Sequence, residues 1–203
     1  MRLRIYVEGG PKSCHADGLR RFKNGFKQHL ARLDPLLNTL DVSPCGSTED
    51  TIRDFAHALR EQKPGCIVGL LVDSDAPVTA DSPAKYLQSK LDSANIPQDA
   101  RANIFLMVQC MESWLVTDVA ALEKCFGKSL KASALPKNPN IEAVSKRDVL
   151  DSLASAVKPT SKGPYHKIRH GAEILAALDP ECVDRRSGHA RDLHAFLRHS
   201  ARA

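Results

Sequence analysis

The chain has 203 residues, which is enough for one hydrophobic core and short for two, so we expect one α/β domain with a helical extension. Its formal charge of +5 is mild, and it contains neither a signal-peptide core nor an apolar run of the roughly 20 residues that span a bilayer. The six cysteines are scattered without a zinc-binding spacing, which indicates a reduced, cytoplasmic protein with no membrane partner.

The first predicted strand is 2–7, because its residues alternate enough in polarity and Glu8-Gly9-Gly10-Pro11 ends it sharply. Residues 16–33 carry apolar side chains at helical spacing, which predicts a helix packed on the sheet. Another face of this helix is basic and either is a solvated surface or contacts phosphate. Its cations are Arg20, Lys23 and Lys27.

The middle of the chain predicts a short strand at 38–42 and then a helix that begins after Ser47, a favourable N-cap residue. The run at 66–72 is apolar without alternation, which is typical of a strand buried on both faces in a parallel sheet. Ser82-Pro83 marks the start of a further helix.

A second buried strand is predicted at 103–110, followed by a helix that continues with breaks to Phe126 and stops at Gly127. The segment 128–144 lacks periodicity, and loops of this length in compact domains are usually functional or disordered. We therefore expect it to lie over a site or toward a partner. The chain divides into an α/β core at 1–127 and a loop plus helical extension at 128–203.

Carboxylates follow three of the predicted strands: Glu8 follows the first, Asp73 and Asp75 the central one, and Glu112 the last. If these strands are parallel, the four acids share the edge of the sheet where α/β proteins bind ligands. Oxygen ligands suit a hard cation such as Mg²⁺ or Mn²⁺. Each acid also has an ordinary explanation, because Asp favours turns and an acid in a first helical turn meets the helix dipole.

A basic segment, SKGPYHKIRH at 161–170, surrounds a Gly-Pro turn and a helix start. Lys, Arg and helix N-terminal amides are common phosphate ligands. His166 and His170 lack the intervening glutamate of a zinc protease and an obvious third ligand, so no zinc site is expected. The expected nucleic-acid or phosphate contacts are Gly9, Gly10, Lys12, Lys162, Tyr165, His166, Lys167 and Arg169.

An acid after the first strand and an Asp-x-Asp after a later one resemble the Toprim domain of topoisomerases, primases and several nucleases. The matching segments are YVEGG at 6–10 and LLVDSD at 70–75. The whole chain also resembles the bacterial family labelled domain of unknown function 4276. This second resemblance rests on MVQCMESWLVTD at 107–118, ALPKNPNIEAVSKRDVL at 134–150 and KGPYHKIRH at 162–170, in addition to the first two segments.

The resemblance implies a Toprim-like, Rossmannoid α/β fold, with a mostly parallel sheet of about four strands flanked by helices and a C-terminal helical extension. It also implies that Asp73 and Asp75 hold magnesium, and that Glu8 is a further ligand or the general acid/base. Gly9 and Gly10 would let the backbone approach the phosphate. Members often lie beside ATPases in mobile and phage-defence neighbourhoods, which implies an ATPase partner. A catalytic role for Glu112 rests only on predicted geometry.

The function expected from these residues is a magnesium-dependent nuclease that cleaves phosphodiesters with water as the nucleophile. An alternative is a non-catalytic Toprim-like module that binds an ATPase partner or nucleic acid. A third interpretation, a phosphatase of the haloacid dehalogenase kind, fits less well because its Asp-x-Asp follows the first strand, whereas here the pair follows a later one.

Overall fold

The structure, a computed structural model, describes residues 2–10 and 16–202. Its sheet has four strands in the order β2-β1-β3-β4, and all three neighbouring pairs are parallel. The strands are β1 (Arg2–Val7), β2 (Asp41–Pro44), β3 (Cys66–Asp73) and β4 (Ile104–Met107). This confirms the predicted Toprim-like α/β fold, a parallel sheet of four strands flanked by helices.

Both faces of the sheet are covered, which explains why its strands are apolar without alternation. On one face, Val68, Leu70 and Val72 of β3 pack in a core with residues of α2 (Thr48–Arg60) and α4 (Gln88–Ser93). Ser47 caps α2 as predicted, because its hydroxyl accepts the Asp50 amide at 3.2 Å.

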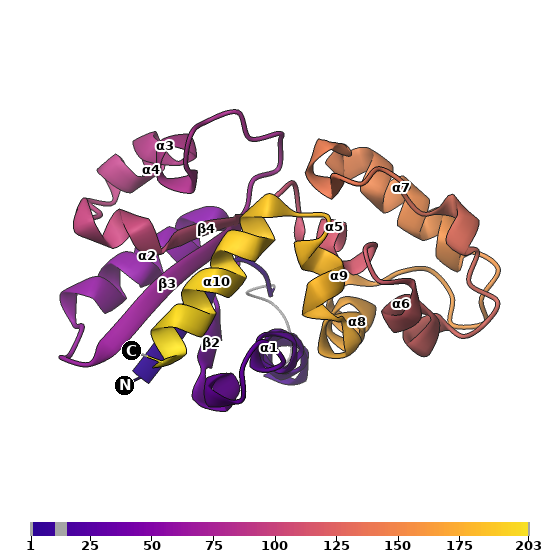
Figure 1. Cartoon of the computed structure of the whole chain (residues 1–203), viewed down its shortest axis with the longest axis horizontal. Coiled ribbons are helices and arrows are strands. Elements are labelled where there is room, and N and C mark those ends of the chain that lie inside the picture. The colour runs from indigo at the N-terminus through magenta and orange to yellow at the C-terminus, as the bar shows by residue number, and fades with distance from the viewer. Residues whose placement is uncertain (1, 11–15, 203) are drawn as a thin grey trace.

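The opposite face is covered by α1 (Ala16–Ala31) and by the last helix, α10 (Gly188–Arg202). Figure 1 shows α10 lying across the sheet, and Phe196 of this helix stacks against Phe105 of β4 at a ring distance of 4.9 Å. The end of the chain therefore packs on the central sheet.

Two strands differ in extent from the prediction. The second begins at Asp41, because Pro35–Thr39 forms a 3-10 helix (η1) that Asp34 caps by accepting the Leu36 amide at 3.0 Å. The last strand ends at Met107 and not at Cys110. The residues that follow it are also buried, which is why the apolar run extends beyond the strand.

The helix predicted from Met111 to Phe126 is two helices, α5 (Met111–Leu115) and α6 (Val119–Phe126). The break arises because the Asp118 side chain caps the second helix and accepts the Ala121 amide at 3.0 Å. Trp114, in the first of these helices, is fully buried in the main hydrophobic core.

The predicted loop 128–144 holds two short 3-10 turns, η3 (Ala132–Ala134) and η4 (Ile141–Ala143). The Arg186 guanidinium secures this loop by donating to the carbonyls of Pro136 and Asn138, both at 2.7 Å. The loop is therefore held against the turn that precedes α10.

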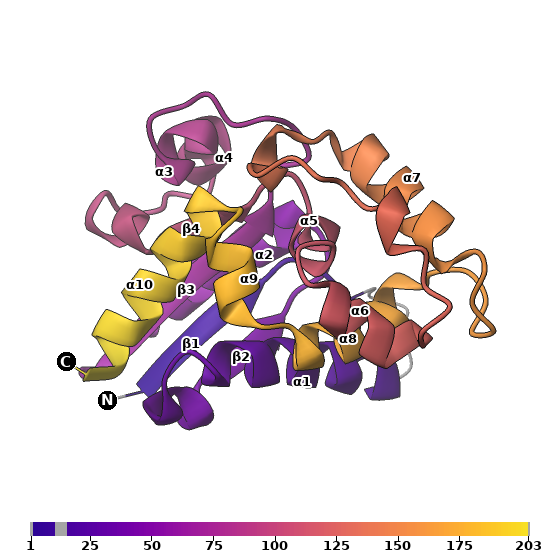
Figure 2. The ribbon, with the colours of Figure 1, turned by 45° about the vertical axis from the view of Figure 1, so that its right-hand side comes forward.

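The C-terminal part continues with α7 (Lys146–Val157), a π-helix η5 (Lys167–Gly171), α8 (Ala172–Ala177) and α9 (Pro180–Asp184). Figures 1 and 2 show α6, α7 and α8 gathered beside α5, away from the end of the sheet where β1 begins. Gly25 permits α1 to meet α8 closely, since an added Cβ would lie 2.6 Å from the Ala172 carbonyl oxygen.

The remaining short elements are α3 (Pro83–Tyr86), which Ser82 caps as predicted, and η2 (Asp99–Asn103) before β4. In the described part of the chain, no helix combines the length and apolar character needed to cross a membrane.

Candidate active site

Three acids meet at the carboxyl edge of the sheet, because β1, β3 and β4 are parallel neighbours. Glu8 follows β1, Asp73 ends β3, and Glu112 lies in the first turn of α5 after β4. Glu8 is joined directly to β3, since its Oε2 accepts the Asp73 amide at 3.1 Å and the Thr48 hydroxyl at 2.7 Å. We call Glu8, Asp73 and Glu112 the acid cluster.

Lys167 of η5 lies between two members of the acid cluster. Its Nζ is 3.5 Å from Asp73 Oδ2 and 3.9 Å from Glu112 Oε2. The second oxygen of each acid is also used: Asp73 Oδ1 accepts the Met111 amide at 3.0 Å, and Glu112 Oε1 accepts the Tyr165 hydroxyl at 3.0 Å. The segment 161–170 thus contributes two side chains to the acidic site itself.

Burial makes this cluster electrostatically unusual, since carboxylates are seldom fully buried. Asp73 is 6% exposed and Glu112 is 2% exposed. Burial raises the pKa of Asp73 to about 7, although the Lys167 ammonium opposes the shift. Burial likewise raises the pKa of Glu8, against the hydrogen bonds from Thr48 and the Asp73 amide.

Lys167 remains charged in this setting. Burial alone would lower its pKa, but the negative charges of Asp73 and Glu112 outweigh burial and raise the pKa. One ammonium therefore faces three carboxylates. Because its pKa is raised, Asp73 can hold a proton near neutral pH, and this proton reduces the negative charge that Lys167 has to balance.

Asp75 lies outside the acid cluster. Its backbone turns with φ of +59°, its amide donates to the Gln109 carbonyl at 2.8 Å, and its carboxylate pairs with Lys146 at the start of α7. The side chains of Asp75 and Lys146 border a cleft of about 500 Å³ that Arg147 also lines. The two aspartates of the Asp-x-Asp motif thus face different cations.

A second cleft, of about 480 Å³, lies directly beside the acid cluster and is lined by Glu8, Gly9, Gly10 and Lys167, among others. Gly9 and Gly10 adopt φ of +127° and +84°, a region that other residues rarely enter. The Gly9 amide and carbonyl both bond to Gly46, at 2.9 and 3.1 Å. The predicted glycine turn is therefore next to the acids.

The segment 161–170 reaches the acids because of a glycine. An added Cβ at Gly171 would lie 2.9 Å from the Tyr165 hydroxyl and 3.1 Å from Met111 Cε. A side chain at position 171 would press against the ends of the Tyr165 and Met111 side chains, so the glycine leaves room for Tyr165 to reach Glu112. The sequence singled out Tyr165 and Lys167 as phosphate contacts but gave no indication that they contact the acids, and it missed Thr48 entirely.

The other predicted phosphate ligands are placed differently. Lys162 pairs with Glu173 at 3.1 Å, and His166 Nδ1 accepts the Arg169 amide at 3.4 Å, which caps η5. Arg169 is exposed. Lys12 lies outside the described residues. In the basic stripe of α1, Arg20 pairs with Asp17 and Lys23 with Asp41, so much of that charge is neutralised within the chain.

Over residues 2–10 and 16–202, no three His, Cys, Asp or Glu side chains are grouped closely enough to hold a metal ion. The donor set nevertheless fits one chemically, because carboxylate oxygens are the ligands that Mg²⁺ and Mn²⁺ prefer. The acid cluster also has more negative charge than Lys167 balances. By their chemistry, Asp73, Glu8 and Glu112 are the residues that would hold a divalent cation, and the Lys167 ammonium lies next to Asp73 and Glu112.

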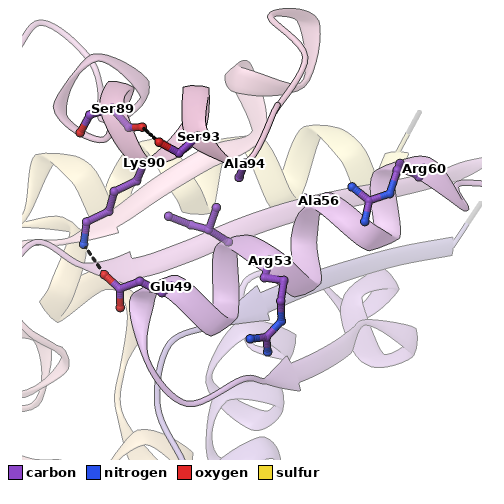
Figure 3. Close-up of a pocket in the computed structure, with 9 residues that line it drawn as sticks. Glu49, Arg53, Ala56, Arg60, Ser89, Lys90, Ser93 and Ala94 are labelled. Carbon is purple, nitrogen blue, oxygen red and sulfur yellow. Dashed lines mark hydrogen bonds and ion pairs between the residues drawn. The ribbon is translucent and has the colours of Figure 1, made fainter.

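A separate groove of about 460 Å³ lies between α2 and α4, and none of its lining residues belongs to the acid cluster (Figure 3). Of the described residues that line it, Glu49 is the one carboxylate, and it pairs with Lys90 at 2.9 Å. This groove lacks the converging acids of the strand ends.

The parallel sheet with acids at its carboxyl edge gives the chain an α/β fold of the kind that the Toprim resemblance implies. The chain belongs to the family described as Domain of unknown function (DUF4276), whose sequence model matches residues 19–198. The fold is similar to the solved C-terminal region of the Burkholderia pseudomallei OLD protein, with a TM-score of 0.50, 19% identity and 98% of each chain covered. No curated protein matches the chain.

The family match begins after the first strand and the glycine turn. Glu8, Gly9 and Gly10 are therefore assigned to the site by their position in the structure, where Glu8 bonds to the Asp73 amide, and not by the family match.

Proposed function

We propose that the protein is a Mg²⁺- or Mn²⁺-dependent nuclease that hydrolyses phosphodiester bonds. The observation that carries the proposal is the acid cluster: three carboxylates from three adjacent parallel strands, two of them almost fully buried. Buried carboxylates are costly unless they are paired or bind a cation. A divalent cation would balance the charge that Lys167 leaves uncompensated.

The residues take distinct roles in this proposal. Asp73, Glu8 and Glu112 would hold the ion, and Asp75 would join them if its pair with Lys146 opened. A bound ion of this kind polarises phosphoryl oxygens and lowers the pKa of water. Gly9 and Gly10 line the cleft beside the cluster, where the phosphate backbone of a substrate would approach.

Water is the nucleophile in this proposal, because the tyrosines are engaged elsewhere. The Tyr165 hydroxyl donates to Glu112, and burial raises its pKa, so a phenolate is disfavoured. The Tyr86 hydroxyl donates to the Ser74 carbonyl at 2.6 Å. Tyr6 is buried next to Arg4.

The substrate would be nucleic acid, contacted by cations around the site such as Lys162, Arg169 and Arg147. The ATPase partner and the role in phage defence implied by the family resemblance belong to the same proposal, as does the cytoplasmic location indicated by the scattered cysteines. In this proposal the protein is an effector nuclease whose activity is controlled by an ATPase partner.

A second candidate is a non-catalytic module that binds nucleic acid or an ATPase. The observation that favours it is that Lys167 and Lys146 already pair with Asp73, Glu112 and Asp75. Such pairing would let the acids serve as structural partners of the C-terminal segment.

Cleavage of labelled single- and double-stranded DNA and RNA with Mg²⁺ or Mn²⁺ separates the two candidates. Asp73→Asn keeps an oxygen for the Met111 amide but removes the charge, so a nuclease should lose cleavage. Asp81→Asn is the matched control, since Asp81 is exposed and pairs with Lys85 away from the site. A wild type that cleaves none of these substrates with either metal would refute the nuclease and favour the binding module.

A further inference from the structure

The oxygens of Asp73 and Glu112 are divided between fixed donors and one ammonium. Asp73 commits Oδ1 to the Met111 amide, and Glu112 commits Oε1 to the Tyr165 hydroxyl, both at 3.0 Å. The remaining oxygens, Asp73 Oδ2 and Glu112 Oε2, both face Lys167 Nζ. Lys167 thus takes the position that any cation shared by these two carboxylates would take.

Lys167 is held there by charge and not by short hydrogen bonds. A charge-assisted N–H···O bond is about 2.7–2.9 Å long, whereas Nζ lies 3.5 Å from Asp73 and 3.9 Å from Glu112. The Lys167 side chain is 41% exposed, against 4% for Asp73 and 3% for Glu112. The Lys167 side chain is partly exposed while the acids are buried, and the ammonium can leave them without breaking a short hydrogen bond.

The cleft beside the acid cluster gives the Lys167 ammonium space to move away from Asp73 and Glu112. Lys167 lines the cleft of about 480 Å³ that Glu8, Gly9 and Gly10 border on the other side. Lys167 is the first residue of η5, which follows the Gly163 turn. Its side chain can rotate into this cleft while the Tyr165 hydroxyl remains bonded to Glu112.

We propose that Lys167 is a tethered counter-ion that competes with a divalent cation for Asp73 and Glu112. In the absence of a divalent cation it compensates the two buried carboxylates, and cation binding requires it to move aside. This inference rests on the metal site of the proposed function. It adds that the C-terminal segment sets how tightly that site binds its ion.

Calorimetric titration of Mg²⁺ and of Mn²⁺ into the full chain tests the competition. Lys167→Met keeps the length and apolar stem of the side chain and removes the charge. The matched control is Lys90→Met, since Lys90 has a side chain 46% exposed and pairs with Glu49 outside the cluster. We expect Lys167→Met to bind either ion about three- to fivefold more tightly than wild type, the upper range for losing a partly exposed ion pair, and Lys90→Met to match wild type.

Equal or weaker binding by Lys167→Met would overturn the proposal, because Lys167 would then be indifferent to the ion or would support it. Absence of binding in both proteins would also overturn it. If circular dichroism shows that Lys167→Met does not fold, Lys167→Gln takes its place and has to show the same tightening.

These outcomes are distinct from those of the nuclease test. If wild type cleaves but Lys167→Met does not bind the ion more tightly, the counter-ion proposal is refuted and the nuclease proposal stands. If Lys167→Met binds the ion more tightly but wild type cleaves no substrate, the counter-ion proposal stands and the nuclease proposal is refuted.

Discussion

Asp73 makes the stability of the protein depend on pH in a direction opposite to that of most carboxylates. Its pKa rises from 3.8 to about 7 on folding, chiefly through burial. Because the folded-state pKa lies above the unfolded one, the stabilisation by protonated Asp73 is complete below about pH 4 and is lost as the pH rises through about 7. A tenfold change in an ionisation constant is worth about 1.4 kcal/mol, so the loss is on the order of 4 kcal/mol.

We therefore expect Asp73→Asn to change the pH profile of the unfolding free energy in the presence of EDTA. Other acids add their own pH dependence to both proteins, so the measured quantity is the wild-type value minus the variant value, from urea unfolding between pH 4 and 8.5. This difference should fall by a few kcal/mol across the range. Asp81→Asn, at an exposed position, should keep the wild-type profile.

Mg²⁺ provides the second half of this experiment. An ion that binds only the folded protein, at a concentration one hundred times its Kd, adds about 2.7 kcal/mol to the unfolding free energy. The addition should appear in wild type at pH 8 and be absent from Asp73→Asn. Parallel pH profiles for wild type and Asp73→Asn, with equal responses to Mg²⁺, would refute the electrostatic account of the cluster.

Three further predictions concern the contacts that build the site and its support. Thr48→Val removes the hydroxyl that donates to Glu8 at 2.7 Å and that keeps its pKa from rising further. It should weaken Mg²⁺ binding in calorimetry several-fold and lower the unfolding free energy by about 1 kcal/mol, whereas an unchanged affinity would exclude Glu8 from the metal site. Gly171→Ala should lower the unfolding free energy by about 1–3 kcal/mol through the clash with the Tyr165 hydroxyl. The cost should shrink in a Tyr165→Phe background, and strict additivity in this double-mutant cycle would contradict the contact. Gly25→Ala should cost about 2 kcal/mol or more in thermal or urea unfolding, since its Cβ would lie 2.6 Å from the Ala172 carbonyl oxygen. Gly188→Ala, whose nearest neighbour is Arg191 at 3.7 Å, should be close to neutral, and equal costs at the two glycines would show that the approach of α1 to α8 is not tight.

The order of elements and the location of the acids were predictable from local pattern. Apolar runs without alternation marked β3 and β4 as buried on both faces, and the turns after them placed Asp73 and Glu112 at strand ends. Strand limits were less predictable. Val108 and Cys110, after the strand, are apolar and as buried as the strand itself, so hydrophobicity does not show where pairing in the sheet ends.

The grouping of the acids required the parallel order β1-β3-β4, which the sequence left as an assumption. The structure also separated the Asp-x-Asp pair, with Asp73 buried among carboxylates and Asp75 turned toward Lys146. Neighbours in sequence point in different directions after a strand ends, because a turn with positive φ at Asp75 redirects the chain.

The sequence by itself determined the α/β class, the strand ends that carry Glu8, Asp73 and Glu112, and the presence of a basic segment at 161–170. Only the tertiary structure decided that Lys167 and Tyr165 of that segment contact the acids and are not simply exposed to a substrate. The strand ends follow from interactions between residues close in sequence. The meeting of Lys167 with Asp73, in contrast, depends on how α8 packs on α1 through Gly25 and on the space that Gly171 leaves, and such long-range contacts leave no periodic pattern in the chain.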